Sequence, residues 1–198
     1  MANIKINGNK YNNIERVNFV GADGTSKVSF MDASILENLA SGIAIDEYHD
    51  TQITSILNKY VLREANIGVV DMPNVTSIVA QGFYGCKARE IRFEGLESLP
   101  TGSTFIMMTN LTKAVIGAKL TQLTQQVFNG CSALATLVLR YDGVVTMAND
   151  VLKNTAIANG TGYVYVPSAQ VDNYKANSGW SAYANQIRAI EDYPDEVA

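Results

Sequence analysis

Apolar residues in the middle of the chain recur with a long period, unlike the short period of a single helix or strand. From residue 53 to residue 166 the same spacing of apolar positions appears five times, with successive starts 22, 21, 24 and 24 residues apart. Such a period is typical of solenoids, because each repeat is too small to bury its own apolar face and must stack on its neighbours. The two clearest repeats have apolar positions at Val75, Ile78, Phe83, Cys86, Ile91 and Phe93, and at Leu120, Leu123, Phe128, Cys131, Leu134, Leu137 and Leu139.

Each repeat closes with a short alternating segment. In residues 91–93 and 137–139 the first and third residues are apolar. This alternation predicts a strand whose first and third side chains face the core. The segments around Phe83 and Phe128 run into glycine, which predicts a short helix or turn there. We therefore expect an α/β solenoid of about five turns over residues 49–167, whose parallel strands leave one sheet face open.

The first third of the chain, residues 1–48, follows a different pattern. Alternating apolar residues on both sides of Asn7 and Gly8 predict a hairpin, and a third alternating run completes a small antiparallel β module. A short helix at residues 34–39 and a connector at residues 40–50 are expected before the solenoid. The module is too thin to cover its apolar side chains, so we expect it to bury them in an assembly with another copy or a partner. These assembly residues are Ile4, Ile6, Val17, Phe19, Val28 and Phe30.

The pattern changes again over residues 168–198. Ser168 is expected to cap a helix through Val171 and Tyr174, and an apolar face with several aromatic residues follows. Such an end can seal the last turn of a solenoid, so we predict a helical, aromatic cap. The acidic residues 191–196 are expected to form a mobile tail. The apolar face after the helix contains Trp180, Tyr183, Ile187 and Ile190.

Composition and charge narrow the class of protein. Apolar residues make up 47% of the 198 residues and charged residues 17%, as in a well-packed globular protein. The net charge of −4 argues against binding to nucleic acid or to an anionic membrane surface. No apolar run approaches the roughly 20 residues that a membrane span needs. The first residues lack the apolar stretch of a secretory signal, so we expect a protein that is made and kept in the cytoplasm, or that leaves it by lysis or assembly.

The two cysteines occupy the same position of the repeat. Cys86 and Cys131 lie two repeats apart, and two strand spacings separate them by about 10 Å. A disulfide requires Cα atoms within about 7 Å. Both cysteines are therefore expected to be free and buried in the core.

Residues that could support catalysis are few. His49 is the only histidine, and it lies beside Asp46, Glu47 and Asp50 in the expected connector. Carboxylates with an imidazole can bind a divalent cation, but ligands adjacent in sequence rarely converge, and a solvated linker is the favoured interpretation. Phosphate-binding glycine motifs are absent from the sequence. We expect no catalytic residue, cofactor or metal.

Several segments resemble the BspA-like (Treponema-type) leucine-rich repeat. The resemblance rests on residues 75–78 with 82–86 and on residues 127–134, and it extends over about residues 51–167. Glu64 stands where that family has cysteine, and Ala88 or Arg89 takes a usual leucine position. Residues 163–167 and the aromatic residues after them are similar to the cap that closes many such proteins. The opening residues resemble short N-terminal modules of phage structural proteins from gut bacteria that carry these repeats.

The open sheet face is the predicted partner-binding surface. Arginine and tyrosine are enriched in interface hot spots, and both occur at outward positions of the predicted strands. The alternative is that the charged residues form ordinary cross-strand pairs and that the tyrosines cover the cap. The partner-binding residues predicted on this face are Arg92, Glu94, Lys113, Val138, Arg140, Tyr163 and Tyr165.

The resemblance implies a non-enzymatic phage virion protein, such as a head or tail decoration, a fibre or an adhesin-like accessory. Its partners would be other virion proteins, copies of itself, and a host surface protein or glycan. The alternative is a bacterial surface adhesin of BspA type that binds host proteins at the cell surface. An enzyme is the third hypothesis, and no group of residues supports it.

Overall fold

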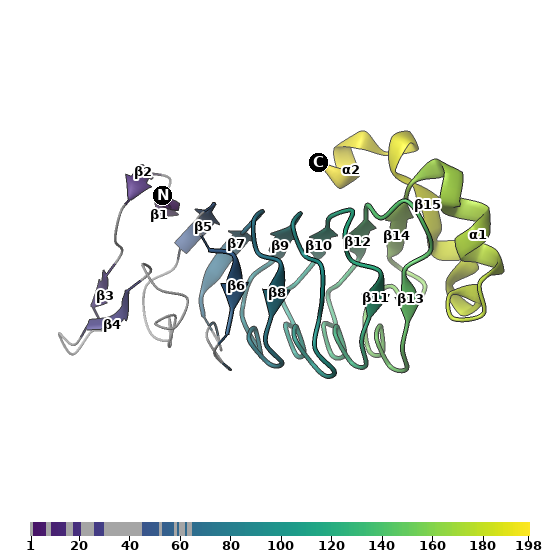
Figure 1. The fold of residues 1–198 in the computed structure, drawn as a ribbon, viewed down its shortest axis with the longest axis horizontal. Coiled ribbons are helices and arrows are strands. Elements are labelled where there is room, and N and C mark those ends of the chain that lie inside the picture. Colours follow the sequence, from purple (N-terminus) through teal and green to yellow (C-terminus); the bar gives the residue numbers. More distant parts are fainter. Residues whose placement is uncertain are drawn as a thin grey trace.

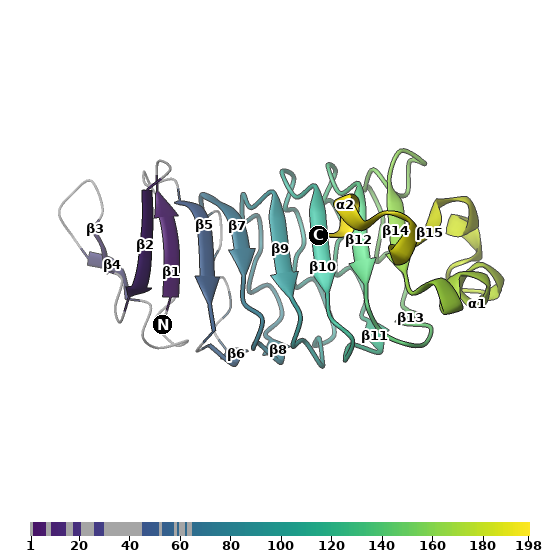
Figure 2. The same ribbon diagram turned by 90° about the horizontal axis from the view of Figure 1, so that it is seen from above.

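A computed structural model of the chain describes residues 2–6, 9–14, 18–20, 26–29, 45–51, 53–57, 59, 62 and 65–198. Successive coils each contribute one strand to a long sheet, and these strands lie side by side along the molecule (Figures 1 and 2). Among the described residues this main sheet has nine strands. They are β1 (Ala2–Ile6), β2 (Asn9–Ile14), β5 (Ile45–Asp50), β7 (Ile67–Asp71), β9 (Glu90–Phe93), β10 (Lys113–Ile116), β12 (Thr136–Leu139), β14 (Tyr163–Val166) and β15 (Ile187–Ala189).

The strands from β5 to β15 form one parallel ladder. The order in the sheet is β15-β14-β12-β10-β9-β7-β5-β1-β2, and only β1 and β2 are antiparallel to their neighbours. The expected parallel sheet is confirmed, but it is longer than about five strands. The prediction of a connector is wrong for residues 45–50, which form β5. Ile45 and Tyr48 point into the core and align with Ile67 and Val70 of β7.

Short strands and turns complete each coil on the side away from the main sheet. β6 (Ser55–Ile56) pairs in parallel with β8 (Ser77–Ile78), and β11 (Gln122–Leu123) pairs in parallel with β13 (Thr146–Met147). The sequence predicted a short helix or a turn in the segments around Phe83 and Phe128, which run into glycine. In the structure these segments are turns. Two positions in each turn adopt the left-handed conformation that favours glycine. In four successive coils the first position is Gln81, Ser103, Gln126 and Asp150, and the second is Gly85, Met107, Gly130 and Asn154.

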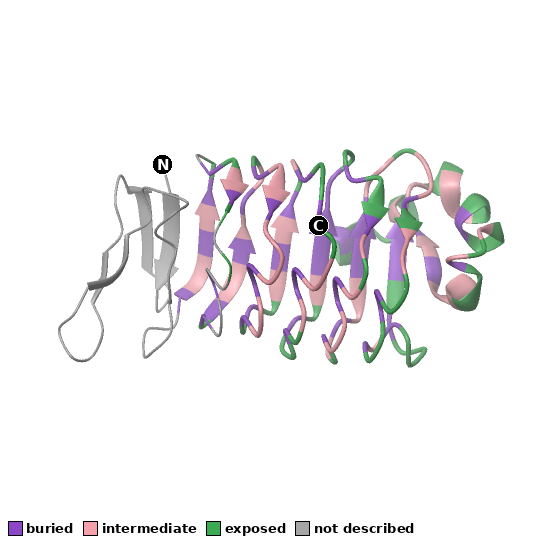
Figure 3. Ribbon diagram, turned by 60° about the horizontal axis from the view of Figure 1, so that its bottom comes forward, coloured by how far each residue is buried: buried purple, intermediate pink, exposed green. Residues whose placement is uncertain are grey.

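The interior of the coils contains the apolar residues of the repeat. Every apolar position assigned to the repeats from Val75 to Leu139 is buried, and buried segments recur from coil to coil in Figure 3. Of the two residues that could take the usual leucine position of this repeat, Ala88 is buried and Arg89 is exposed. In the last repeat Val145 is buried, whereas Val144 is only partly buried. Glu64 lies outside the described residues.

Both cysteines are free and buried, as predicted. The Sγ of Cys131 lies 2.9 Å from the main-chain oxygen of Phe105, and the Sγ of Cys86 lies 3.7 Å from that of Ala65. Burial raises the pKa of each thiol to about 12, because the thiolate would lose its hydration. The cysteines therefore behave as small apolar side chains of the core.

The N-terminal strands do not form the separate three-stranded module that the sequence predicted. The antiparallel pairing expected between the segments before and after residues 7–8 is confirmed, since β1 pairs with β2. However, β1 also pairs with β5, because both present free backbone groups at their edges, and the hairpin thereby extends the main sheet. A separate two-stranded ladder consists of β3 (Asn18–Val20) and β4 (Ser26–Ser29). The expected boundary after residue 48 falls within β5, and the helix expected at residues 34–39 lies outside the described residues.

The C-terminal region packs on the last coil and then returns to the sheet. It contains η1 (Ser168–Gln170), α1 (Val171–Ala176), η2 (Ser181–Gln186), β15, η3 (Ile190–Asp192) and α2 (Pro194–Val197). Tyr174 and Trp180 are fully buried, and the Trp180 Nε1 donates to the Val145 oxygen at 2.7 Å. Within the described residues, no helix is long and apolar enough to span a bilayer.

Three details of this region differ from the sequence-based prediction. Ser168 begins η1 and makes no capping hydrogen bond through its side chain. Ile187 lies in a strand that pairs with β14, since the free edge of the sheet offers backbone partners there. The acidic residues 191–196 are not an unstructured tail, because η3 and α2 fold back over the sheet (Figure 2).

Candidate functional site

Side chains on the outer face of the main sheet form rows, because the parallel strands are in register. The central row is charged at the N-terminal end of the solenoid, apolar or aromatic from β10 to β14, and charged again at β15. Its members, from β5 to β15, are His49, Asp71, Arg92, Val115, Val138, Tyr165 and Arg188. A second row contains Glu47, Val69, Glu90, Lys113, Thr136 and Tyr163.

A group of ion pairs crosses the middle of the face. The Arg92 guanidinium contacts the Glu90 carboxylate at 2.6 Å, and the Lys113 Nζ lies 3.7 Å from the same carboxylate. Arg140 pairs with Glu94 at 3.2 Å across two coils. Partly exposed pairs of this kind contribute little stability, about 0–1 kcal/mol each. Their main effect is to hold three cationic side chains in place on the sheet.

Gly117 makes the long-range pair between Arg140 and Glu94 possible. The backbone places Gly117 between these residues, since its N–H donates to the oxygen of Phe93 and the Arg140 N–H donates to that of Ile116. A Cβ at Gly117 would lie 1.8 Å from the main-chain oxygen of Glu94. Glycine is therefore required for the close approach of the two backbones.

The C-terminal segment, residues 194–198, covers the apolar half of the central row. Val197 is buried there in a cluster with Val115, Val138 and Tyr165, and α2 contacts β12. Figure 2 shows α2 above β10 and β12. This cover explains why Val115 and Val138 are buried although they point out of the solenoid core.

The cationic side chains on the same face donate to the end of the C-terminal segment. Arg140 Nη2 lies 3.0 Å from the main-chain oxygen of Val197. Arg92 Nη2 lies 3.1 Å from the oxygen of Ala198, to which Lys113 Nζ also donates. Three charged donors thus converge on two neighbouring main-chain oxygens.

The tyrosines predicted on this face have different environments. Tyr165 is buried, with its ring 5.6 Å from that of Tyr193, and burial raises the pKa of its hydroxyl. Tyr163 stays 38% exposed, and the Arg188 guanidinium lies 4.6 Å from its ring centroid. This geometry is a cation–π contact.

The structure brings six of the seven predicted sheet-face residues into one connected group. Arg92, Lys113 and Arg140 contact the C-terminal segment, Val138 and Tyr165 lie beneath it, and Glu94 holds Arg140. Tyr163 lies at the side of this group, against Tyr165. Sequence reasoning missed Val197 and Arg188, and it assigned Ile190 to the apolar face of the cap, whereas Ile190 packs against this group. A single valine within an acidic run was the only available signal for Val197.

The residues predicted to mediate assembly lie in the N-terminal strands. Ile4 and Ile6 belong to β1, and Phe19 pairs with Val28 between β3 and β4. Val17 and Phe30 lie outside the described residues. Their role in assembly stays a prediction.

The acidic and histidine residues at 46–50 do not converge on one point. Tyr48 and Asp50 face the core, where the Tyr48 hydroxyl donates to the Asp50 carboxylate at 2.6 Å. His49 faces outward, with its Nδ1 2.7 Å from the Asp71 carboxylate. Alternation along β5 thus separates neighbouring ligand types. Across the part of the chain that the structure describes, no three His, Cys, Asp or Glu side chains are placed to share a metal ion.

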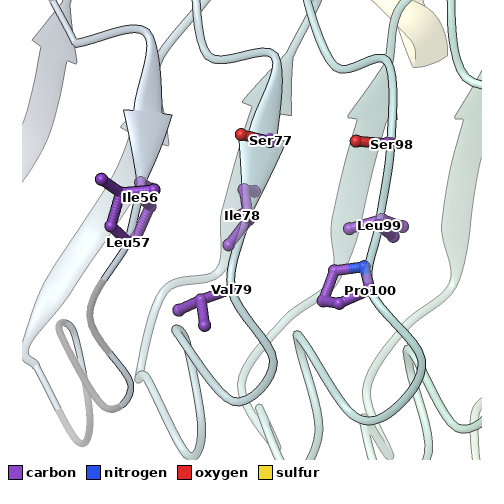
Figure 4. Close-up of a pocket in the computed structure, with 8 residues that line it drawn as sticks. All are labelled: Ile56, Leu57, Ser77, Ile78, Val79, Ser98, Leu99 and Pro100. Carbon is purple, nitrogen blue, oxygen red and sulfur yellow. The ribbon is translucent and has the colours of Figure 1, made fainter.

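An apolar groove lies on the other side of the solenoid, beside β6 and β8 (Figure 4). Its volume is about 320 Å³, and Leu57 at its edge is 66% exposed. The groove is separate from the rows of the outer face. Its lining residues are Ile56, Leu57, Ser77, Ile78, Val79, Ser98, Leu99 and Pro100.

Comparison with known proteins identifies the repeat. Residues 54–168 match the family described as BspA type Leucine rich repeat region, with six copies of the repeat. No curated protein and no solved structure matched the chain.

Proposed function

Because the chain belongs to the family of BspA type leucine-rich repeat proteins, we propose that it is a non-enzymatic scaffold that binds another protein through the outer face of its main sheet. Leucine-rich repeats generally mediate protein–protein interaction. The observation that carries the proposal is the open half of this face over β5 and β7. There His49 and Asp71 keep 35% and 29% of their side-chain surface exposed, beside Val69 in the neighbouring row.

The ends of the solenoid support its role as a self-contained scaffold. The β1–β2 hairpin lies against β5 at one end, and α1 with η2 lies against the last coil at the other. We propose that both segments act as caps. Covered ends direct binding to the faces of the solenoid, since terminal caps prevent open stacking of repeats.

The scaffold is proposed to be a phage virion protein present in several copies, as a head or tail accessory. Support comes from the resemblance of residues 3–30 to N-terminal modules of phage structural proteins. Its partners would then be other virion proteins or copies of itself, together with a host surface protein or glycan. The second candidate is a bacterial surface adhesin of BspA type, which the repeat family equally supports.

Val69→Arg tests the binding face. Val69 lies between Glu47 and Glu90 in its row, so an arginine there would meet carboxylates and leave the fold intact. We expect at least a tenfold loss of the protein from purified particles, measured by quantitative mass spectrometry. Lys153→Ala is the control, because this exposed residue lies in a turn away from the sheet.

Two results would contradict the proposal. Equal incorporation of Val69→Arg and Lys153→Ala would show that the open half of the face does not bind another protein of the particle. Recovery of the protein at the surface of the producing cell, and not in particles, would favour the adhesin.

A further inference from the structure

We propose that the sheet surface beneath α2 is a receptor for an acidic peptide segment of a partner protein, and that the chain's own residues 194–198 occupy it as an internal competitor. The inference rests on the proposed function, because it assigns part of the binding face. We define the receptor as an apolar floor with a cationic rim. The floor is Val115, Val138 and Tyr165, and the rim is Arg92, Lys113 and Arg140.

The floor has the form of a binding pocket for one branched side chain. Its three members align in register on β10, β12 and β14. In the same row, β7 has Asp71 and β9 has Arg92 in place of an apolar residue. Two valines side by side on the outside of a solenoid would leave an apolar patch in water, and here Val197 covers it. A valine-sized side chain is therefore the ligand that this floor fits.

The rim supplies recognition of the backbone and of negative charge. Its three cations donate to the oxygens of Val197 and Ala198, and hydrogen bonds from charged donors are stronger than those from neutral ones. Glu90 and Glu94 hold the same cations. The rim thus stays in position when the segment leaves, and it favours a peptide that carries carboxylates.

The segment that fills the receptor buries a single side chain. Helix α2 has four residues, and Val197 is its only buried one. So short a helix is not stable by itself. The side chains of Asp195 and Glu196 are exposed to solvent. A short, acidic segment that is anchored by one side chain and by its last two main-chain oxygens is suited to displacement by a partner segment of the same chemistry.

Competition inside one chain has a measurable consequence. A tethered segment has an effective concentration in the millimolar range, so an external peptide binds only to the fraction of molecules in which the receptor is open. Releasing the segment should raise the apparent affinity by the reciprocal of that fraction. Val197→Asp releases it, because a carboxylate cannot be buried against the two valines of the floor.

The experiment measures binding of a fluorescein-labelled peptide with the sequence of residues 190–198 to the full chain by fluorescence anisotropy. We expect the Val197→Asp protein to bind the peptide at least tenfold more tightly than the unchanged protein. Ala176→Asp is the matched control, since it introduces the same side chain at an exposed position of α1, and it should bind like the unchanged protein. A peptide with aspartate at the position of Val197 should not bind.

A second substitution tests the rim. Arg140→Met is added to the Val197→Asp protein. Methionine keeps an unbranched apolar stem like that of arginine but lacks the charged donor. This change should weaken peptide binding at least fivefold. The proposal is overturned if Val197→Asp binds no more tightly than the unchanged protein, or if Arg140→Met has no effect on the Val197→Asp protein. Neither result bears on Val69, whose particle assay tests the proposed function separately.

Discussion

Phe105 lies at the centre of the aromatic core, and its removal gives the sharpest test of the stacking. Its ring centroid is 5.3 Å from that of Phe83, 5.6 Å from that of Phe93 and 5.4 Å from that of Phe128. All four side chains are fully buried. Among the aromatic contacts of the described residues, Phe128 contacts only Phe105. Phe105 and Phe128 occupy equivalent positions in successive coils, but Phe105 makes three ring contacts and Phe128 makes one.

The difference in ring contacts sets the expected magnitude. Truncation of a buried phenylalanine to alanine costs about 3–5 kcal/mol, and each aromatic pair adds about 0.5–1.5 kcal/mol beyond its buried area. Phe105 makes two more pairs than Phe128. We expect Phe105→Ala to lower the free energy of unfolding by about 1–3 kcal/mol more than Phe128→Ala does. The total stability of a domain is about 5–15 kcal/mol, so the Phe105→Ala protein should be close to unfolding.

Equilibrium unfolding in urea, followed by far-ultraviolet circular dichroism, measures both losses. Phe105→Leu is the control, because it retains most of the side-chain volume and should cost less than Phe105→Ala. The reasoning is refuted if Phe105→Ala costs less than about 1 kcal/mol, well below the range for a core aromatic residue. It is also refuted if Phe128→Ala is the more damaging change.

Three further predictions concern the backbone and the buried thiols. Met107→Gly should raise the free energy of unfolding by up to about 1 kcal/mol in urea, because Met107 is 46% exposed and adopts a left-handed conformation (φ 61°); a decrease would contradict this. Gly117→Ala should lower it by about 1–3 kcal/mol, because its Cβ would clash with the oxygen of Glu94; an unchanged urea midpoint would contradict it. Burial raises the pKa of Cys86 and Cys131 from 9.0 to about 12, so their contribution to stability is complete below about pH 9 and is lost as the pH rises toward 12. The stability measured across this range should fall by about 1.4 kcal/mol per pH unit for each thiol, and replacing both cysteines by alanine should flatten the curve.

The stacked core could be predicted from the sequence because stacking imposes one spacing on every coil. Phe83 and Phe128 each occupy the same position of the coil as an apolar residue of the preceding coil, so their inward orientation could be read from the repeat. Strand β5 could not be predicted, because Asp50 gives it the composition of a solvated linker. In the structure Asp50 is buried, and it accepts hydrogen bonds from the Tyr48 hydroxyl at 2.6 Å and from the Ile53 N–H at 3.3 Å. A buried carboxylate with such partners is tolerated, but its partners are invisible in a hydropathy pattern.

The sheet-face residues were predictable as a surface, but their occupant was not. Alternation in the strands placed Val138 and Arg140 on the outside, and the structure agrees. The contact of Val197 with Val115 joins residues about 80 positions apart, and no local periodicity connects them. The α2 segment is also too short to produce a helical pattern. Its position follows from tertiary packing alone.

The place of the C-terminal segment restricts how the number of coils can vary. Its floor comes from three consecutive coils, and the pair between Arg140 and Glu94 joins two coils separated by a third. Duplicating or deleting a coil among β9, β10, β12 and β14 would put different side chains under α2. A coil added between β5 and β9 would lengthen the open half of the face and leave the covered half unchanged. The solenoid can therefore change in length near its N-terminal end without altering the surface that α2 covers. Its length and the packing of its C-terminal segment can evolve independently.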